Sequence, residues 1–399
     1  MKNTPISKPK TLPKKGLSRQ KIIKQLSKRL GKDFTYDSGR IVGSMCTNPN
    51  RFARSVYAKY LEKNLGDLGL FPNTAQIEKE AIQMLGSLLA LPQAAGNIVS
   101  GGTEANILAL WAARNSAIPE KDEIVLPETA HFCFDKAADL LRLKLIKIRL
   151  NGNFQVDSKE VKNAMNQRTL AIVGIAGTTD LGVVDPIPEL SEIALANNLY
   201  LHIDAAFGGF VLPFLKNNSH IPTFDFRLPG VSSITIDPHK MGLAPIPAGA
   251  VLFRNAELLK KIQTNVGYLA GGESPQTMLG TRPGASAIAV WSVLKYMGTK
   301  GYKKVIRGCM ALTQRFVEEI ETITGINLVT KPIINVIGIR SDLLNIFELA
   351  NLLRRKGWAV ALFPNHIRIV IMPHIRPIHI TLMIRDLKSI MRNYLKRGR

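Results

Sequence analysis

The sequence predicts an α/β protein with two parts: a large domain built on a mostly parallel, helix-flanked sheet, and a small α+β domain at the C-terminal end. Two observations predict this class. From about residue 75, short apolar runs alternate with stretches of helical periodicity, which is typical of βαβ units. From about residue 286, long helical stretches come first and short β-branched runs follow, which indicates a separate, mixed layer.

The bulk composition narrows the class of protein. The chain has 399 residues, 46% of them hydrophobic and 21% charged, as expected of a soluble globular protein. We find no apolar stretch long enough to cross a bilayer and no secretory signal. Cys46, Cys133 and Cys309 form no metal-binding spacing and no disulfide framework, so we expect a reducing, cytoplasmic location.

The formal net charge of +23 is the unusual bulk feature. It could indicate nucleic acid as a partner or, more weakly, a transit peptide, although lysine dominates over arginine. Residues 1–15 are predicted to be a basic flexible tail, because Pro5, Pro9 and Pro13 prevent a helix there. Without an aromatic-interleaved basic motif, we expect a solvated basic surface and no nucleic-acid partner.

Three structured segments are expected after the tail. Residues 16–74 are predicted to form a helix and loop segment, in which Ser18 caps the helix and Gly31 ends it. Residues 75–285 are predicted to form the large domain, and residues 286–399 the small C-terminal domain. The apolar runs that predict strands of the large sheet are EIVLP, KLIKIRL, TLAIVGIAG, LYLHID, SSITID and GAVLFR.

Ligands of open parallel sheets bind beyond the carboxyl ends of the strands, so the residues after each apolar run are candidates. The run NIV is followed by SGGTEAN, which opens a helical stretch. Gly101 and Gly102 allow backbone N–H groups to approach a ligand, and a helix N-terminus favours an anion. The pattern is neither a dinucleotide fingerprint nor a Walker loop. An ordinary structural cap explains the glycines equally well.

Further candidates stand at other strand exits. His131 follows EIVLPETA, Thr178 and Thr179 follow AIVGIAG, Asp204 ends LYLHID, and Lys240 follows SITIDPH. A charged group at the exit of a core strand costs free energy unless a partner or a reaction requires it. The two alanines after Asp204 leave room for a flat ring.

Together these groups suit pyridoxal phosphate, which needs a lysine for covalent attachment, a carboxylate for the pyridine nitrogen and a phosphate cradle. Two alternatives stay open. Asp204 and Lys240 could form a structural ion pair beside an ordinary glycine cap. His202, Asp204, Asp237 and His239 could hold a metal, but this spacing is a loose pattern, and we expect no metal.

Several motifs also resemble a known family. SGGTEAN, GIAGTT, HIDAAFGG and SITIDPHKMGLAPIPAGAVLFR resemble the group II pyridoxal-phosphate-dependent decarboxylases, and among them most of all the archaeal L-tyrosine/L-aspartate decarboxylase family. GSMCT, KNLGDLGLF, LGTR and IVIMPH extend the resemblance from about Leu17 to the last helix. The resemblance implies the type I aminotransferase fold, pyridoxal 5′-phosphate as cofactor in residues 75–285, and a homodimer with residues 16–74 at its interface.

The resemblance assigns roles to individual residues. Lys240 matches the lysine that holds the cofactor covalently, and Asp204 matches the partner of the pyridinium nitrogen. Burial of Lys240 is then expected to favour its neutral form. His131 matches the histidine stacked on the ring, with Ala206 on the other face. Gly102 and Thr103 match phosphate contacts, with Gly101, Thr178 and His239 beside them. Arg368 matches the arginine that holds the substrate α-carboxylate. The acid that protonates Cα is Tyr268, His239 or Lys240.

The resemblance leaves the substrate open. It implies a lyase that converts L-aspartate to β-alanine and CO2, for coenzyme A, or L-tyrosine to tyramine, for methanofuran. Aspartate needs a second cation, which a basic chain supplies readily, so we favour aspartate. Asn50 in place of a histidine, Cys133 in place of a serine, and an altered loop at residues 268–282 bear on this choice. Transamination and retro-aldol cleavage are the alternative reactions.

Overall fold

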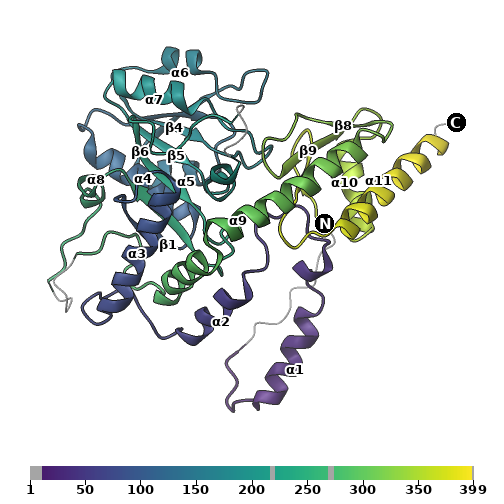
Figure 1. The fold of residues 1–399 in the computed structure, drawn as a ribbon, viewed down its shortest axis with the longest axis horizontal. Helices are drawn as coiled ribbons and strands as arrows, with labels where there is room; N and C mark the ends of the chain where they lie inside the picture. Colours follow the sequence, from purple (N-terminus) through teal and green to yellow (C-terminus); the bar gives the residue numbers. More distant parts are fainter. Residues whose placement is uncertain (1–10, 216–220, 268–273, 398–399) are drawn as a thin grey trace.

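The computed structural model describes residues 11–215, 221–267 and 274–397, and two sheets form its core (Figure 1). The larger sheet has seven strands in the order β1-β7-β6-β5-β4-β2-β3. Strand β7 is antiparallel to β1 and β6, and the other neighbours are parallel. The strands are β1 Ala95–Val99, β2 Glu123–Pro127, β3 Lys144–Ile148, β4 Thr169–Ile175, β5 Tyr200–Asp204, β6 Val231–Ile236 and β7 Gly249–Phe253. The predicted α/β class with a mostly parallel sheet is confirmed.

Helices cover both faces of this sheet, because its central strands are apolar on both sides. One face packs against α4 (Gly102–Ser116), α5 (Cys133–Leu141) and α8 (Ala256–Lys260). The other packs against α3 (Pro72–Leu88), α6 (Ser158–Ala164) and α7 (Ile187–Ala196). The short 3-10 turns η2 (Gly208–Phe210) and η3 (Leu212–Phe214) follow β5 on this second side.

The C-terminal part is built on a four-stranded antiparallel sheet in the order β10-β11-β9-β8. Its strands are β8 Ile326–Leu328, β9 Val336–Ser341, β10 Ala361–Leu362 and β11 Ile367–Val370. Helices α10 (Ile346–Arg355) and α11 (Pro377–Arg397) close its core together with the last turns of α9. Helix α9 (Gly284–Ile320) runs from the large sheet to this small one (Figure 1), and its backbone breaks at Gly298 (φ 53°).

The N-terminal segment reaches across to the C-terminal sheet. Helix α1 (Arg19–Leu30) begins after Ser18, whose Oγ accepts a hydrogen bond from the Lys21 N–H, and it ends at Gly31 as predicted. It projects away from the body of the protein (Figure 1), and none of its residues is buried. After η1 (Tyr36–Ser38), Val42 enters the C-terminal core, and α2 (Arg51–Lys59) packs on α9.

Two of the three expected segment boundaries fall inside helices. Helix α3 begins at Pro72, ahead of the expected start at residue 75, and the boundary at 285/286 lies in the first turn of α9. The division into segments stays a prediction. No helix in the described part of the chain is both long and apolar enough to span a bilayer.

Candidate active site

A cavity of about 340 Å³ opens at the carboxyl edge of the large sheet. Strands β1, β2, β4, β5 and β6 all end at this edge, so residues far apart in the sequence meet there. Eight of the predicted site residues line the cavity: Gly101, Gly102, Thr103, His131, Asp204, Ala206, His239 and Lys240. Tyr268 lies outside the described residues.

Lys240 forms an ion pair that the sequence analysis did not assign. Its Nζ lies 2.9 Å from Oδ2 of Asp237, three residues earlier, and its side chain is 20% exposed, toward the cavity. Burial alone lowers the pKa of Lys240, but the charges of Asp237 and Asp204 outweigh that effect and raise it above the ordinary value. The expectation that burial leaves this amine neutral is therefore wrong for the chain without a cofactor.

Asp204 is fixed by two hydrogen bonds. Its Oδ1 accepts from the Ala206 N–H at 3.0 Å, and its Oδ2 accepts from Nδ2 of Asn106 at 2.9 Å. Asn106 comes from the second turn of α4 and ends the SGGTEAN motif. Two donors on one carboxylate hold it in one orientation toward the cavity.

A neutral histidine orients Asn106 from behind. The amide Oδ1 of Asn106 lies 3.0 Å from Nε2 of His202, and Nδ1 of His202 lies 2.8 Å from Oγ of Ser233. Because the amide nitrogen donates to Asp204, the amide oxygen must accept, so His202 carries its proton on Nε2. Burial lowers the pKa of His202 to about 4, which keeps this ring neutral at ordinary pH.

The glycines expose bare backbone where an anion can approach. A Cβ on Gly102 would come within 2.9 Å of Oδ2 of Asp237 and 3.3 Å of Cβ of Ala206, so only glycine leaves this wall open. The first N–H groups of α4, from Gly102 and Thr103, have no acceptor within the helix. This end of the cavity has the features of a phosphate cradle.

The two cavity histidines are biased toward the neutral form. Burial lowers the pKa of His131, whose Nδ1 accepts a hydrogen bond from the Cys133 N–H at 3.2 Å. Burial also lowers the pKa of His239. Nδ1 of His239 accepts from the Ala248 N–H at 3.1 Å, which leaves Nε2 as the donor, 3.6 Å from Asp237. Neutral rings of this kind can stack on a flat ligand or donate one proton.

Two predicted residues lie behind the cavity wall. Oγ1 of Thr178 is buried and accepts a hydrogen bond from the Val183 N–H, while the adjacent Thr179 lines the cavity. Arg368, on β11, is buried too: its Nη1 donates to the Thr179 carbonyl at 2.6 Å and its Nη2 donates to the Gly43 carbonyl. Its Nε has no partner among the described residues. Thr179 thus lies between the guanidinium of Arg368 and the cavity.

Asn50 and Cys133, the two residues that differ from the family pattern, both form hydrogen bonds within the protein. Asn50 caps α2, where its Oδ1 accepts from the Phe52 N–H at 2.9 Å, and it does not line the cavity. Cys133 begins α5, and its Sγ accepts from Nδ2 of Asn106 at 3.2 Å. Burial raises the pKa of Cys133 to about 12, so it remains a thiol. Cys133 is thus part of the group that positions Asp204.

Pyridoxal phosphate fits this set of residues. The amine of Lys240 faces the same cavity as the carboxylate of Asp204, and the open wall at Gly102 lies beside them. No cluster of three or more metal-ligating side chains occurs in the described part of the chain. A lysine amine, a fixed carboxylate and an open backbone wall at one cavity of an α/β fold are the groups that pyridoxal-phosphate enzymes use.

Comparisons with known proteins agree. Residues 4–341 match the model of the pyridoxal-dependent decarboxylase conserved domain, and the chain belongs to this group II decarboxylase family. The chain is 50% identical over 380 residues to an L-aspartate decarboxylase of Thermococcus kodakarensis, covering 95% of this chain and 98% of that one. It is 49% identical over 359 residues to a probable L-tyrosine/L-aspartate decarboxylase of Methanothermobacter thermautotrophicus, covering 89% and 98%.

A solved structure supports the fold over nearly the whole chain. The sphingosine-1-phosphate lyase of Burkholderia pseudomallei superposes with a TM-score of 0.90 at 26% identity, covering 98% of this chain and 94% of that one. The predicted family, fold class and pyridoxal phosphate cofactor are therefore confirmed, and the chain is a pyridoxal-phosphate-dependent amino-acid decarboxylase. The roles of the individual site residues stay predictions.

The sequence analysis missed two residues that touch the predicted ones. The sequence predicts Asp237 only as an alternative metal ligand, although its place three residues before Lys240 in DPHK is an available signal. Asn106 was quoted only as the end of SGGTEAN. Its contact with Asp204 spans 98 positions in the sequence, and no local pattern reports it.

Proposed function

We propose that this chain removes the α-carboxylate of L-aspartate, releasing CO2 and β-alanine, a precursor for coenzyme A. The observation that carries the proposal is the convergence of Lys240, Asp204 and the Gly102 cradle on one cavity. The preference for aspartate is supported by the name of the T. kodakarensis relative. The name of the M. thermautotrophicus relative supports L-tyrosine, with tyramine as product, as the second candidate.

Each site residue has a role in this reaction. When bound, pyridoxal phosphate supplies a ring that accepts the electron pair of the broken Cα–carboxylate bond. Asp204, held by Asn106 and the Ala206 N–H, keeps a proton on the ring nitrogen. His131 presents a neutral ring as a stacking surface. We assign the phosphate to the backbone at Gly102 and Thr103, near Nε2 of His239. This fixed arrangement of charges is the main contribution of the protein.

Two further residues act on the substrate. Lys240 would hold the cofactor, and its amine, when free, could carry a proton to Cα. Arg368 lies behind Thr179, and we assign the substrate α-carboxylate to its guanidinium. A substrate carboxylate would replace the carbonyl contacts that this guanidinium makes now. Tyr268 and His239 are the other candidates for the proton transfer to Cα.

The proposal is tested with a panel of amino acids and the cofactor-loaded protein. We expect CO2 release from L-aspartate with kcat/KM at least tenfold above that for L-tyrosine or L-glutamate, about 1.4 kcal/mol of discrimination. Lys240→Ala should abolish turnover and the visible absorption band of the covalently held cofactor. A higher kcat/KM for tyrosine would select the second candidate, and keto-acid formation or retro-aldol cleavage in place of CO2 release would contradict the decarboxylase proposal.

We propose in addition that the chain works as a homodimer in the cytoplasm, with residues 16–74 at the subunit interface, residues 75–285 as the cofactor-binding domain and residues 286–399 as the small domain. The exposed apolar side of α1 supports the dimer: Ile23 is 54% exposed and Leu30 is 58% exposed. A helix with such a stripe is stable only when another surface covers it. The three free cysteines support a reducing location.

A further inference from the structure

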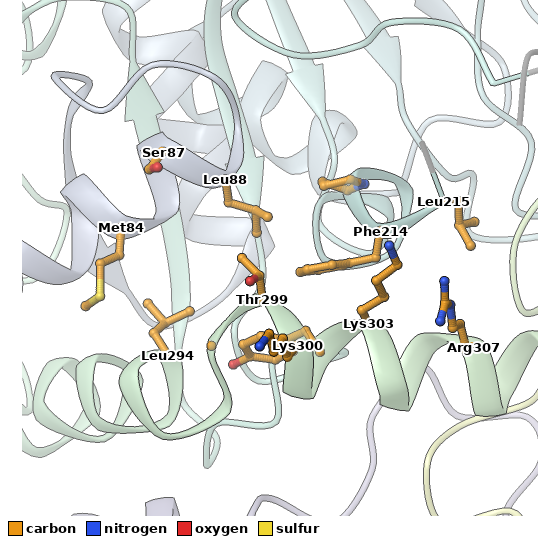
Figure 2. Close-up of a pocket in the computed structure, with 13 residues that line it drawn as sticks. Met84, Ser87, Leu88, Phe214, Leu215, Leu294, Thr299, Lys300, Lys303 and Arg307 are labelled. Carbon is orange, nitrogen blue, oxygen red and sulfur yellow. The ribbon is translucent and has the colours of Figure 1, made fainter. Parts of the chain in front are cut away.

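A second cavity, of about 810 Å³, lies between α3, η3 and α9 (Figure 2). It shares no lining residue with the cavity that holds Lys240. Its volume is in the range of small-molecule sites, about 300–1,000 Å³. The cavity lies where the backbone of α9 breaks at Gly298, so its walls are formed by secondary-structure elements and not by a surface loop alone.

The two ends of this cavity differ in polarity. Met84 and Leu88 of α3 and Leu294 of α9 gather at one end, and Lys303 and Arg307 extend toward η3 at the other (Figure 2). The apolar side chains are only partly buried, so they offer contact area to a ligand.

The cations of this cavity are not neutralised within the described part of the chain. Lys300, Lys303 and Arg307 follow one another at spacings of three and four, so they share one side of α9. No carboxylate is among the described lining residues, and none of the three cations forms an ion pair with a described residue. Unpaired cations beside apolar surface are complementary to a molecule with an apolar body and an anionic head.

We propose that this second cavity binds a free aliphatic carboxylate, with its chain against Met84, Leu88 and Leu294 and its head at Lys303 and Arg307, and that its occupancy influences the active site. Charge complementarity selects this occupant. Helix α1 of a second copy carries its own lysines and arginines and would be repelled. A membrane surface would not enter a concave site of this size.

A direct contact connects the second cavity to the active site. Tyr302 lines the cavity, stacks on Phe214 at 5.7 Å between ring centroids, and donates its buried hydroxyl to the Gly242 carbonyl at 2.9 Å. Gly242 follows Lys240 by two residues in the same turn. A ligand that packs on Phe214 and Tyr302 is therefore connected, through the hydrogen bond from Tyr302 to Gly242, to the turn that carries the catalytic lysine.

Binding is tested by calorimetry on the cofactor-loaded protein with octanoate, decanoate and decyltrimethylammonium. Each buried methylene should tighten the Kd by about fourfold, so decanoate should bind about tenfold or more tighter than octanoate. The cationic analogue should bind at least tenfold more weakly than decanoate. Equal affinity for the two charges, or displacement of decanoate by the amino-acid substrate, would overturn the proposal.

A pair of adjacent lysines provides the matched control. Lys303 lines the cavity and Lys304 does not, although both are exposed on α9. We expect Lys303→Gln to weaken decanoate binding several-fold, and Lys303→Gln with Arg307→Gln to weaken it about tenfold, because each exposed ion pair contributes modestly. Lys304→Gln should leave the Kd unchanged. An unchanged Kd in the double variant, or an equal loss in Lys304→Gln, would place the binding elsewhere.

The influence on the active site is tested with Tyr302→Phe, which removes the hydroxyl and keeps the ring. Saturating decanoate should change kcat/KM at least twofold in the parent protein and less in Tyr302→Phe, with the same Kd in both. This measurement rests on the proposed function, so the visible absorption of the bound cofactor is followed as a second readout. No response in the parent protein by either readout, or the same response in both proteins, would overturn the coupling and leave the binding result intact.

Discussion

Lys240 and Asp237 are three positions apart, and the turn after β6 brings Nζ of the lysine within 2.9 Å of the carboxylate. Burial lowers the pKa of Lys240, but the charge and hydrogen bond of Asp237, together with the charge of Asp204, outweigh it, so the amine stays protonated in the cofactor-free chain. Covalent attachment requires the neutral amine. With the role proposed for Lys240, Asp237 would hold the lysine in place and slow the attachment of the cofactor at neutral pH.

Asp237→Asn should accelerate cofactor uptake at neutral pH. Removing the negative charge lowers the pKa of Lys240, so the neutral amine appears at a lower pH. Uptake by the cofactor-free protein should rise with pH in both proteins, with a lower midpoint in the variant. Stopped-flow absorbance measures the rate. Asp135→Asn, at a surface pair with Lys147, is the control and should keep the parent midpoint. Coincident profiles for Asp237→Asn and the parent would show that Asp237 does not set this pKa.

Asn106→Ala should lower kcat/KM by about 10- to 150-fold. The variant loses one charged hydrogen bond to Asp204, typically about 1.5–3 kcal/mol, and frees the carboxylate to turn. The loss should appear in kcat, and the absorption of the bound cofactor should change, which a purely structural defect would not produce. Asn115→Ala, at the far end of α4, is the matched control and should keep the parent kcat/KM. Equal activity of the two variants would remove Asn106 from the site.

At the scale of elements, Glu78 of α3 and Arg282 before α9 form a buried pair that holds β1 at the edge of the sheet. Nη2 of Arg282 donates to Oε2 of Glu78 at 2.7 Å. Nη1 of Arg282 donates to the Ile98 carbonyl at 2.8 Å, and the Ile98 N–H donates to Glu78 at 2.8 Å. Three segments distant in the sequence are thereby joined beneath the SGGTEAN loop.

Glu78→Gln should lower the free energy of unfolding by about 3–5 kcal/mol, because it removes the carboxylate that pairs directly with the buried guanidinium of Arg282. Urea unfolding at one protein concentration measures the loss. Glu78→Gln with Arg282→Gln should be less destabilised than the sum of the single variants, since the double variant buries no charge. Glu257→Gln, at an exposed pair, should have no measurable effect. Additive losses in the double variant would contradict a direct ion pair.

The elements were largely predictable from local patterns, and their arrangement was not. The run LYLHID predicts β5 and its exit at Asp204, because burial on both faces leaves a continuous apolar run. The run GAVLFR predicts β7 but not its antiparallel direction, which depends on its partners β1 and β6. The contact between Glu78 and Arg282 spans 204 positions, and it arises only once the strand order is fixed.

Site residues were predictable from the sequence where the cofactor needs a particular residue type, such as a lysine or a carboxylate. Asp204 ends its strand, and His131 and Lys240 each follow the end of a strand by four residues, so the topology that buries the strands also brings these residues to one cavity. Thr178 and Thr179 are adjacent, and only the turn geometry decides that Thr179 lines the cavity. Asn106 contacts Asp204 across 98 positions, and no local pattern reports that contact. For Asp237, its place three residues before Lys240 is the one local signal.

At the scale of the whole molecule, α1 is a helix whose apolar side chains stay exposed, because the described residues of its own chain do not bury them. It extends from the body (Figure 1), carries no acidic residue, and leaves Ile22 (44%), Ile23 (54%) and Leu26 (45%) exposed. A short isolated helix of this composition is marginal in water. The proposed dimer accounts for it when the apolar stripe packs on the other subunit.

Ile23→Glu with Leu26→Glu should therefore weaken the dimer. Two carboxylates in the buried stripe lose the apolar contact and cannot be solvated in the interface, so the dissociation constant should rise by at least a hundredfold, about 2.7 kcal/mol. Sedimentation velocity over a range of concentrations measures it. Gln20→Glu with Gln25→Glu is the matched control, because it adds the same charge to the same helix outside the apolar stripe and should leave the constant near that of the parent. Equal dissociation of the two double variants would show that charge, and not the apolar stripe, controls assembly.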